Sequence, residues 1–317
     1  MKIKINILFF LLILCILLSL LIGAQSISLR EALKNADSFS RTIFINLRLP
    51  RTILVFTAGA MLAGSGGVFQ QFFRNPLSDP GIIGVSSGAA LGAVIASFVK
   101  INLNIGSFFG AIFSGLLITF FAGRKTLSNQ FSSSALLLCG TAFGSLYSSC
   151  VAIILSMQEA KMRSIYMWML GSFSGRTWND VFIIVPTSIV ASIFLFLCAR
   201  PLDVLNGGEV SAEALGVNIP LLRASVIASC SLAVSAAVCA GGTIGFVGLA
   251  APHIARKIYG AKTFSLLAFS MMIGSILLLL ADTLSRVVIA PAELPVGTIT
   301  TLCGAPFFIW LLNTKKD

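Results

Sequence analysis

The chain of 317 residues is 57% hydrophobic and only 10% charged, with a mean hydropathy of +0.98. A soluble protein carries about 25% charged residues, so this composition predicts a polytopic integral membrane protein with no separate water-soluble domain. The net charge of +11 comes mainly from Lys and Arg at the ends of apolar runs, where cations orient helices and contact lipid. No basic tract interleaved with aromatic residues occurs, and nucleic acid is not expected as a partner.

Uncharged runs predict the membrane helices, because a bilayer core requires roughly 20 apolar residues per helix. The first run follows two lysines and resembles a secretion signal, but its apolar part (7–24) is long, which favours an uncleaved helix over a cleaved leader. The uncharged stretch 224–255 is too long for one span and contains Gly-Gly and Pro252, so we expect a full helix followed by a short broken one. The ten predicted spans are 6–23, 52–72, 82–99, 104–122, 134–156, 181–199, 224–241, 244–255, 264–281 and 297–312.

An even number of spans places both ends of the chain on one side of the membrane. Lysines at both ends favour the cytoplasm, and this orientation puts twelve of the 22 Lys and Arg inside and ten outside. Such a small inside excess is a weak orientation signal. Arg48 and Arg51, in "NLRLPRT" at the entrance of the second span, then lie outside, where an excess of cations needs its own explanation.

Two segments suggest an inverted repeat. "AGSGGVF" (63–69) in the second span loosely resembles "AGGTIGF" (240–246) in the seventh, and each precedes a proline-bearing break. The number of spans between them would make the two copies run in opposite directions. Inverted repeats with broken helices are typical of transporters.

The sequence contains one motif that resembles an enzyme signature, but helix packing in a membrane explains it better. Residues 84–88 match G-x-S-x-G, which marks a hydrolase nucleophile only on a strand-to-helix turn with an acid and a histidine nearby. Here the motif begins an apolar helix, where small residues allow close helix packing. The sole histidine, His253, has no metal-ligand partner at suitable spacing, the seven cysteines lack any CxxC pair, and no P-loop occurs. We therefore predict no catalytic residue, no metal ligand and no cofactor in this chain.

Acidic residues inside a membrane would indicate ion coupling. Asp282 ends the run "ILLLLAD" and lies four residues before Arg286, a spacing that places both on one helix face. A structural ion pair near the membrane interface is the favoured interpretation over a proton relay. An ion-coupled secondary transporter, or a membrane enzyme that works alone, remains the alternative function.

One polar segment, 200–223, interrupts the apolar pattern between the sixth and seventh spans. We expect a short helix at 209–215, ended by Gly216 as a C-cap, and a new helix opened by Pro220. A solvated connector would show the same composition. Two short helices along the membrane would also form a docking surface for a partner.

Six ordered motifs give the chain a resemblance to one family: the FecCD-type permeases of ABC importers, which carry iron-siderophore, haem or cobalamin. The motifs are "RLPRT" (48–52), "NPLSDPGIIGVSSGA" (75–89), "WMLGSFSGRTW" (168–178), "GEVSAEALG" (208–216), "GFVGLAAPHIAR" (245–256) and "ELPVGTITTLCGAPFF" (293–308). The resemblance implies an all-α type II permease fold in which residues 1–317 form one transmembrane domain.

The resemblance also implies partners and a location. A second copy of the chain would complete the path, two separate ABC ATPase subunits would carry ATP and Mg, and an extracytoplasmic binding protein would deliver a metal chelate. The chain itself would be a multi-pass protein of a bacterial cytoplasmic (inner) membrane, in contact with lipid, with both termini cytoplasmic. An iron compound is the expected cargo, with cobalamin as an alternative.

Residue roles carry over motif by motif. Arg48, Arg51 and Arg286 would meet carboxylates of the binding protein; head-group contact is the alternative role for these arginines. The residues that match the ATPase-coupling pattern are Glu209, Ala212, Glu213 and Gly216. The residues that match the cytoplasmic gate are Asn75, Pro76, Leu77, Ser132, Ser133 and Ser134.

Overall fold

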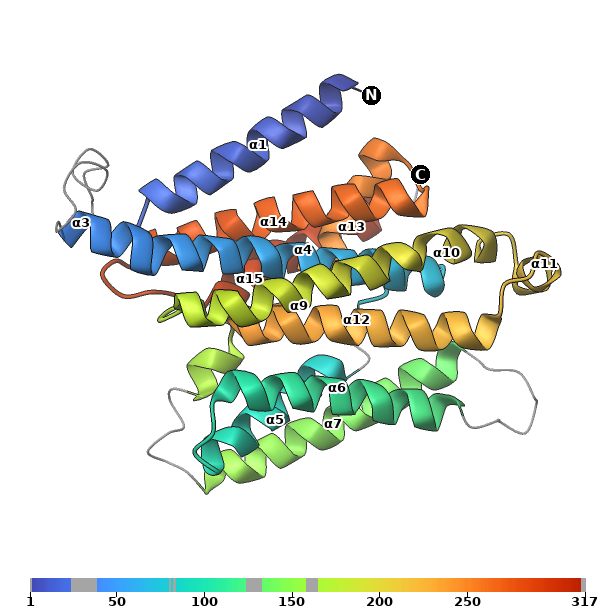
Figure 1. Cartoon of the computed structure of the whole chain (residues 1–317), viewed down its shortest axis with the longest axis horizontal. Coiled ribbons are helices and arrows are strands. Elements are labelled where there is room, and N and C mark those ends of the chain that lie inside the picture. Colours follow the sequence, from blue (N-terminus) through green and yellow to red (C-terminus); the bar gives the residue numbers. More distant parts are fainter. Residues whose placement is uncertain are drawn as a thin grey trace.

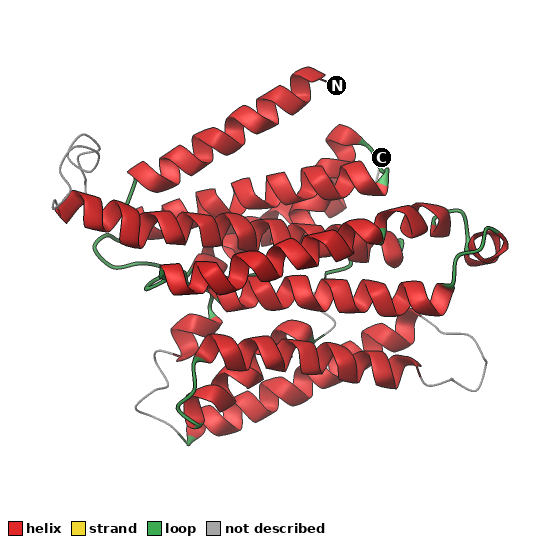
Figure 2. Cartoon of the chain, in the orientation of Figure 1, coloured by secondary structure: helices red, strands yellow, loops and turns green. Residues whose placement is uncertain are grey.

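The computed structural model describes residues 2–23, 39–79, 81, 84–123, 133–157 and 165–314. Every regular element in this part of the chain is a helix (Figure 2). The long elements are α1 (Lys2–Leu21), α4 (Leu49–Phe72), α5 (Val85–Phe98), α6 (Leu103–Gly123), α7 (Ser133–Ser156), α9 (Trp178–Leu197), α12 (Ile219–Gly241), α13 (Val247–Tyr259), α14 (Thr263–Val287) and α15 (Val296–Thr314).

The predicted all-α membrane class is confirmed. Each of the ten predicted runs falls on one of these helices, and within the described residues 7 helices are long and apolar enough to cross a membrane. The other three are α5 and α13, which have only 14 and 13 residues, and α15, whose apolar part at Val296–Phe307 is also too short. The prediction of ten spans is therefore not confirmed as a count of membrane crossings.

The centre of the molecule is formed by α4 and α12, which are mostly buried (Figure 1). α4 packs closely on α14 because both helices carry a glycine at the crossing: a Cβ added at Gly59 would lie 2.5 Å from the carbonyl oxygen of Gly274. A Cβ at Gly88 would lie 2.4 Å from the Cβ of Ser114 in α6. The G-x-S-x-G segment is thus part of a close α5–α6 packing, as predicted.

The long uncharged stretch is broken where the glycines predicted it, between the end of α12 at Gly241 and the start of α13 at Val247. Gly242 has a φ of +74°, and a Cβ there would lie 2.0 Å from the carbonyl oxygen of Trp168. The carbonyl of Gly241 accepts a hydrogen bond from the N–H of Ser172 at 2.7 Å. Neighbouring backbone therefore supplies the partners that a helix break inside a membrane requires.

The predicted repeat receives no local support. Residues 63–69 lie within the continuous helix α4, whereas residues 240–246 cross the break between α12 and α13. The inverted repeat stays a prediction.

The two ends of the helix bundle carry different features. The short helices α10 (Ala199–Leu205) and α11 (Glu209–Ala214) lie at one end, which we call the α11 end, together with the start of α1 and the end of α15 (Figure 1). The other end, which we call the arginine end, holds α3 (Phe39–Thr42), the π-helix η1 (Ile43–Arg48) and the start of α4. Both ends of the chain thus share the side of the polar segment, while its cytoplasmic assignment stays a prediction.

Candidate functional site

A buried ion cluster joins α4, α14 and the segment before α15 at the arginine end. The guanidinium of Arg51 donates from Nη2 to Oδ1 of Asp282 at 2.9 Å and from Nη1 to Oε1 of Glu293 at 2.8 Å. Asp282 is fully buried and also forms an ion pair with Arg286, with 3.2 Å between Nε and Oδ2, while the same Nε donates to the backbone carbonyl of Asp282 at 3.3 Å. The predicted pair of Asp282 and Arg286 is confirmed. The two carboxylates bring three separated segments together.

The same end of the molecule holds the C-terminus of α1. Nη1 of Arg48 donates to the carbonyl oxygens of Leu20 and Leu21 at 2.9 and 2.6 Å, and Nη2 of Arg286 donates to the carbonyl of Ser19 at 3.0 Å. The last carbonyls of a helix lack partners within the helix and form the negative end of its dipole. Two arginines therefore provide hydrogen bonds to the terminal carbonyls of α1 and neutralise the negative end of its dipole. This role explains the cations at the entrance of the second span without reference to membrane orientation.

The three arginines predicted to dock a binding protein are brought together, but they lie inside the chain. Arg48, Arg51 and Arg286 are 6%, 9% and 4% exposed. A carboxylate of a partner could reach them only by displacing a group that now occupies them, of which Glu293, at 28% side-chain exposure, is the accessible one. Their docking role stays a prediction.

The polar segment at the α11 end is folded as the sequence predicts. α11 ends with Gly216 at φ +86°; the N–H of Gly216 donates to the carbonyl of Glu213 and the N–H of Val217 donates to that of Ala212, both at 2.9 Å. This pair of bonds is a Schellman C-cap. α12 then begins at Ile219, and the side chain of Asn218 accepts from the N–H of Leu221 at 3.0 Å.

The predicted coupling residues occupy two faces of this segment. Ala212 is fully buried, whereas Glu209 reaches Nη2 of Arg223 in α12 at 3.1 Å and Glu213 is exposed. Two large apolar side chains flank them on the surface: Val210 is 83% exposed and Leu215 is 74% exposed. Neither residue is among the predicted coupling residues, although their place beside polar residues, in a short helix and at its C-cap, is a signal of a docking face. α11 is thus held on one face and presents apolar groups on the other.

α10 fastens this segment to the rest of the bundle. Oδ1 of Asp203 accepts from the N–H and from Oγ1 of Thr263, the first residue of α14, at 2.9 and 2.6 Å. Arg74, in the loop after α4, donates to the carbonyl of Leu205 at the end of α10. The α11 end is therefore connected through α14 to Asp282 and Arg286, at the opposite end of that helix.

The predicted gate residues of the first group lie in the loop after α4. Asn75 and Leu77 are exposed, and Oδ1 of Asn75 accepts from the N–H of Leu77 at 2.9 Å, which stabilises the turn. Further along the loop, burial raises the pKa of Asp79, while a hydrogen bond from the N–H of Gly81 at 2.5 Å opposes that shift. The described residues 73–79 thus form a turn after α4, and the gating role of this loop stays a prediction.

The structure describes two of the three serines in the second predicted gate group. Ser132 lies outside the described residues, and Ser133 and Ser134 are the first residues of α7. The remaining predicted gate residue, Pro76, is half-buried in the loop described above.

Comparisons with known proteins agree with this arrangement. The FecCD transport family matches residues 11–314. A probable iron chelatin transport system permease protein of Helicobacter pylori is 39% identical, covering 94% of this chain and 95% of that protein. The hemin transport system permease protein HmuU of Yersinia pestis is 34% identical (97% and 95%), and the vitamin B12 import system permease protein BtuC of Klebsiella pneumoniae is 37% identical (96% and 92%).

Solved structures give the same result for the fold. An inward-facing conformation of a metal-chelate type ABC transporter matches with a TM-score of 0.89 and 32% identity, over 99% of this chain and 100% of that one. PsaBC from Streptococcus pneumoniae, at 16% identity and a TM-score of 0.61, shares the fold. The family match across nearly the whole length, together with relatives above 30% identity, shows that the chain belongs to the FecCD transport family, as the sequence motifs predicted.

Proposed function

We propose that two copies of this chain form the membrane path of an ABC importer, driven by two ATPase subunits and supplied with a metal chelate by a binding protein. The observation that carries the proposal is the α10–α11 segment. It is capped at Gly216, bonded to α14 through Asp203, and carries exposed apolar side chains. Such a surface suits a partner that supplies energy from outside, because this chain has no P-loop of its own.

The internal contacts suggest how movement of that segment would reach the path. A partner that displaces α11 would move α10, and α10 is bonded to the first residue of α14 and to the loop after α4. The helix α14 runs without interruption for 25 residues to Val287 and carries Arg286 in its last turn. Close packing makes such an element move as a rigid body. We therefore propose that α14 and the gate loop at 75–77 respond together to the ATPases.

The proposed cargo is an iron chelate. The relatives carry names for iron chelatin, hemin and vitamin B12 transport, all large metal-bearing compounds. The binding protein would select among them, since the chain would only have to offer a path of sufficient width. An ion-coupled transporter is disfavoured because Asp282, a fully buried carboxylate, forms ion pairs with Arg51 and Arg286 and so belongs to a structural cluster.

The function is tested by reconstitution. The chain is placed in liposomes with the ATPase subunits and the binding protein from the same genome, and uptake of a radiolabelled ferric siderophore, haem or cobalamin is measured. We expect ATP-dependent uptake of an iron compound that requires all components. Uptake by the chain alone, driven by a proton or sodium gradient, would establish the alternative instead.

A second test concerns the proposed docking of the binding protein by the arginine cluster. Glu293→Gln removes the accessible carboxylate from Nη1 of Arg51 and leaves that donor for an incoming carboxylate. If docking uses Arg51, the variant should bind the binding protein more tightly, by up to about tenfold, because one charge-assisted bond no longer has to be exchanged. Surface plasmon resonance with nanodisc-embedded protein measures this affinity. Unchanged or weaker binding would argue that the cluster has only a structural role.

A further inference from the structure

A second group of cations, distinct from the arginine cluster, lies at the α11 end of the molecule. Lys4 is in the first turn of α1, Arg256 and Lys257 are in the last turn of α13, and Lys262 is the N-cap residue of α14. The side chains of Lys4, Lys257 and Lys262 are exposed and that of Arg256 is half-buried. Four positive charges from three helices therefore gather in one region.

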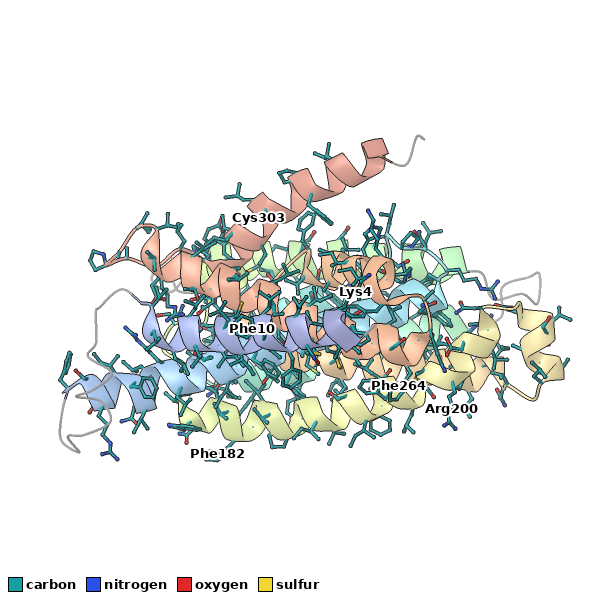
Figure 3. The ribbon with its side chains drawn as sticks, turned by 90° about the horizontal axis from the view of Figure 1, so that it is seen from above. Lys4, Phe10, Phe182, Arg200, Phe264 and Cys303 are labelled. Carbon is teal, nitrogen blue, oxygen red and sulfur yellow. The ribbon has the colours of Figure 1, made fainter. Side chains whose placement is uncertain are left out.

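A tyrosine holds these elements together. The hydroxyl of Tyr259, the last residue of α13, donates to the backbone carbonyl of Lys4 at 2.9 Å. Its ring stacks on Phe269 of α14 at a centroid distance of 3.8 Å. The three helix ends are thus in direct contact, and Figure 3 shows Lys4 on α1 beside this part of the bundle.

Internal pairing does not account for this charge. Among the described residues, no carboxylate lies within the 4.0 Å ion-pair distance of the four side chains. Asp203, which contacts the residue after Lys262, accepts from the backbone N–H and the hydroxyl of Thr263. Counting that carboxylate, the region keeps an excess of three positive charges.

Helix electrostatics explains only half of the cluster. Arg256 and Lys257 stand at a helix C-terminus, where a cation is stabilised by the dipole. Lys4 and Lys262 stand at helix N-termini, where a cation is destabilised. A bound anion would stabilise both lysines.

The surroundings identify the kind of anion. Exposed apolar side chains adjoin the cations in sequence, with Ile7 54% exposed on α1, one turn after Lys4, and Ile258 42% exposed on α13, next to Lys257. A ligand with an anionic head and apolar chains satisfies both features at once. We propose that Lys4, Arg256, Lys257 and Lys262 bind the head group of an anionic phospholipid of the leaflet at the α11 end. The cytoplasmic identity of that leaflet rests on the proposed function, but the lipid site itself does not.

The test measures thermal unfolding of the full chain in neutral detergent with added dioleoylphosphatidylglycerol or dioleoylphosphatidylcholine. We expect the anionic lipid alone to raise the Tm, half-maximally at a concentration that increases with salt. In the triple variant Lys4→Gln, Lys257→Gln, Lys262→Gln, that concentration should rise about a hundredfold, from roughly a fivefold contribution per cation. Arg256 is kept because its half-buried side chain also packs.

Two controls separate binding from folding and from general charge. The variant with arginine at all three positions keeps the charge and should keep the response to phosphatidylglycerol. Lys100→Gln, which removes an exposed lysine outside the cluster, should leave the response unchanged. Equal stabilisation by both lipids, or an undiminished response in the triple glutamine variant, would overturn the proposal. So would a loss of ATPase binding in that variant with its lipid response intact, which would assign the cluster to a protein partner. None of these measurements requires transport, so failure here leaves the importer proposal standing.

Discussion

Asp282→Asn is expected to destabilise the folded chain by about 3–5 kcal/mol. The carboxylate is fully buried and is shared by Arg51 and Arg286, so its neutralisation leaves Arg286 without its acidic partner and Arg51 with Glu293 alone. An uncompensated buried charge is costly because the protein interior solvates it poorly. The Tm in detergent should fall by on the order of 10 °C.

A matched set of variants isolates the cause. Glu293→Gln removes a carboxylate that is 28% exposed and should cost only about 1 kcal/mol. Adding Arg286→Leu to Asp282→Asn should recover part of the lost stability, since it removes the unpaired cation while Arg51 keeps Glu293. If the double variant loses as much stability as the two single substitutions added together, or more, the cluster is not electrostatically coupled. In that case the burial of Asp282 would have to be explained by packing.

The local features of both sites could be predicted from the sequence. The four-residue spacing of Asp282 and Arg286 identifies a helical pair, and Gly216 after a short polar helix identifies its C-cap. Both depend on contacts between residues close in the chain, which helix geometry fixes.

The long-range half of the arginine cluster could not be predicted in this way. Arg51 meets Asp282 and Glu293 across 231 and 242 residues, and Arg48 meets backbone carbonyls of α1, which have no sequence signature at all. A sequence pattern cannot reveal this internal partner, because it is formed only by the packing of α1, α4 and α14. Cations at the entrance of a membrane helix can serve the end of a neighbouring helix as well as a partner.

The number of membrane crossings could not be predicted from the sequence for a related reason. An apolar run indicates burial but does not distinguish a span from a shorter helix packed inside the bundle. The run at 82–99 forms α5 with only 14 residues, packed against α6 through glycine. Helix length is set there by the turn at Gly84 and the contacts of the neighbours, which a hydropathy pattern does not contain.

The largest expected effect on function comes from Val210→Asp combined with Leu215→Asp. Val210 on α11 and Leu215 at its C-cap are 83% and 74% exposed, so the Tm should stay within about 1 °C of the unmodified chain. If this face docks an ATPase, two carboxylates would be desolvated against it, at a cost of roughly 2 kcal/mol or more. Affinity for the ATPase should fall about thirtyfold, and binding-protein-stimulated ATP hydrolysis should fall with it.

Ala214→Asp is the matched control, because Ala214 belongs to the same short helix and is also exposed but carries little apolar surface. Its effect on ATPase affinity should be less than threefold. A pulldown with the purified ATPase measures assembly, and phosphate release measures coupling. If assembly is preserved in the double variant while hydrolysis is lost, α11 transmits movement without supplying affinity. If both are preserved, the apolar face of α11 is not the docking surface, and the proposed path from α10 to α14 loses its starting point.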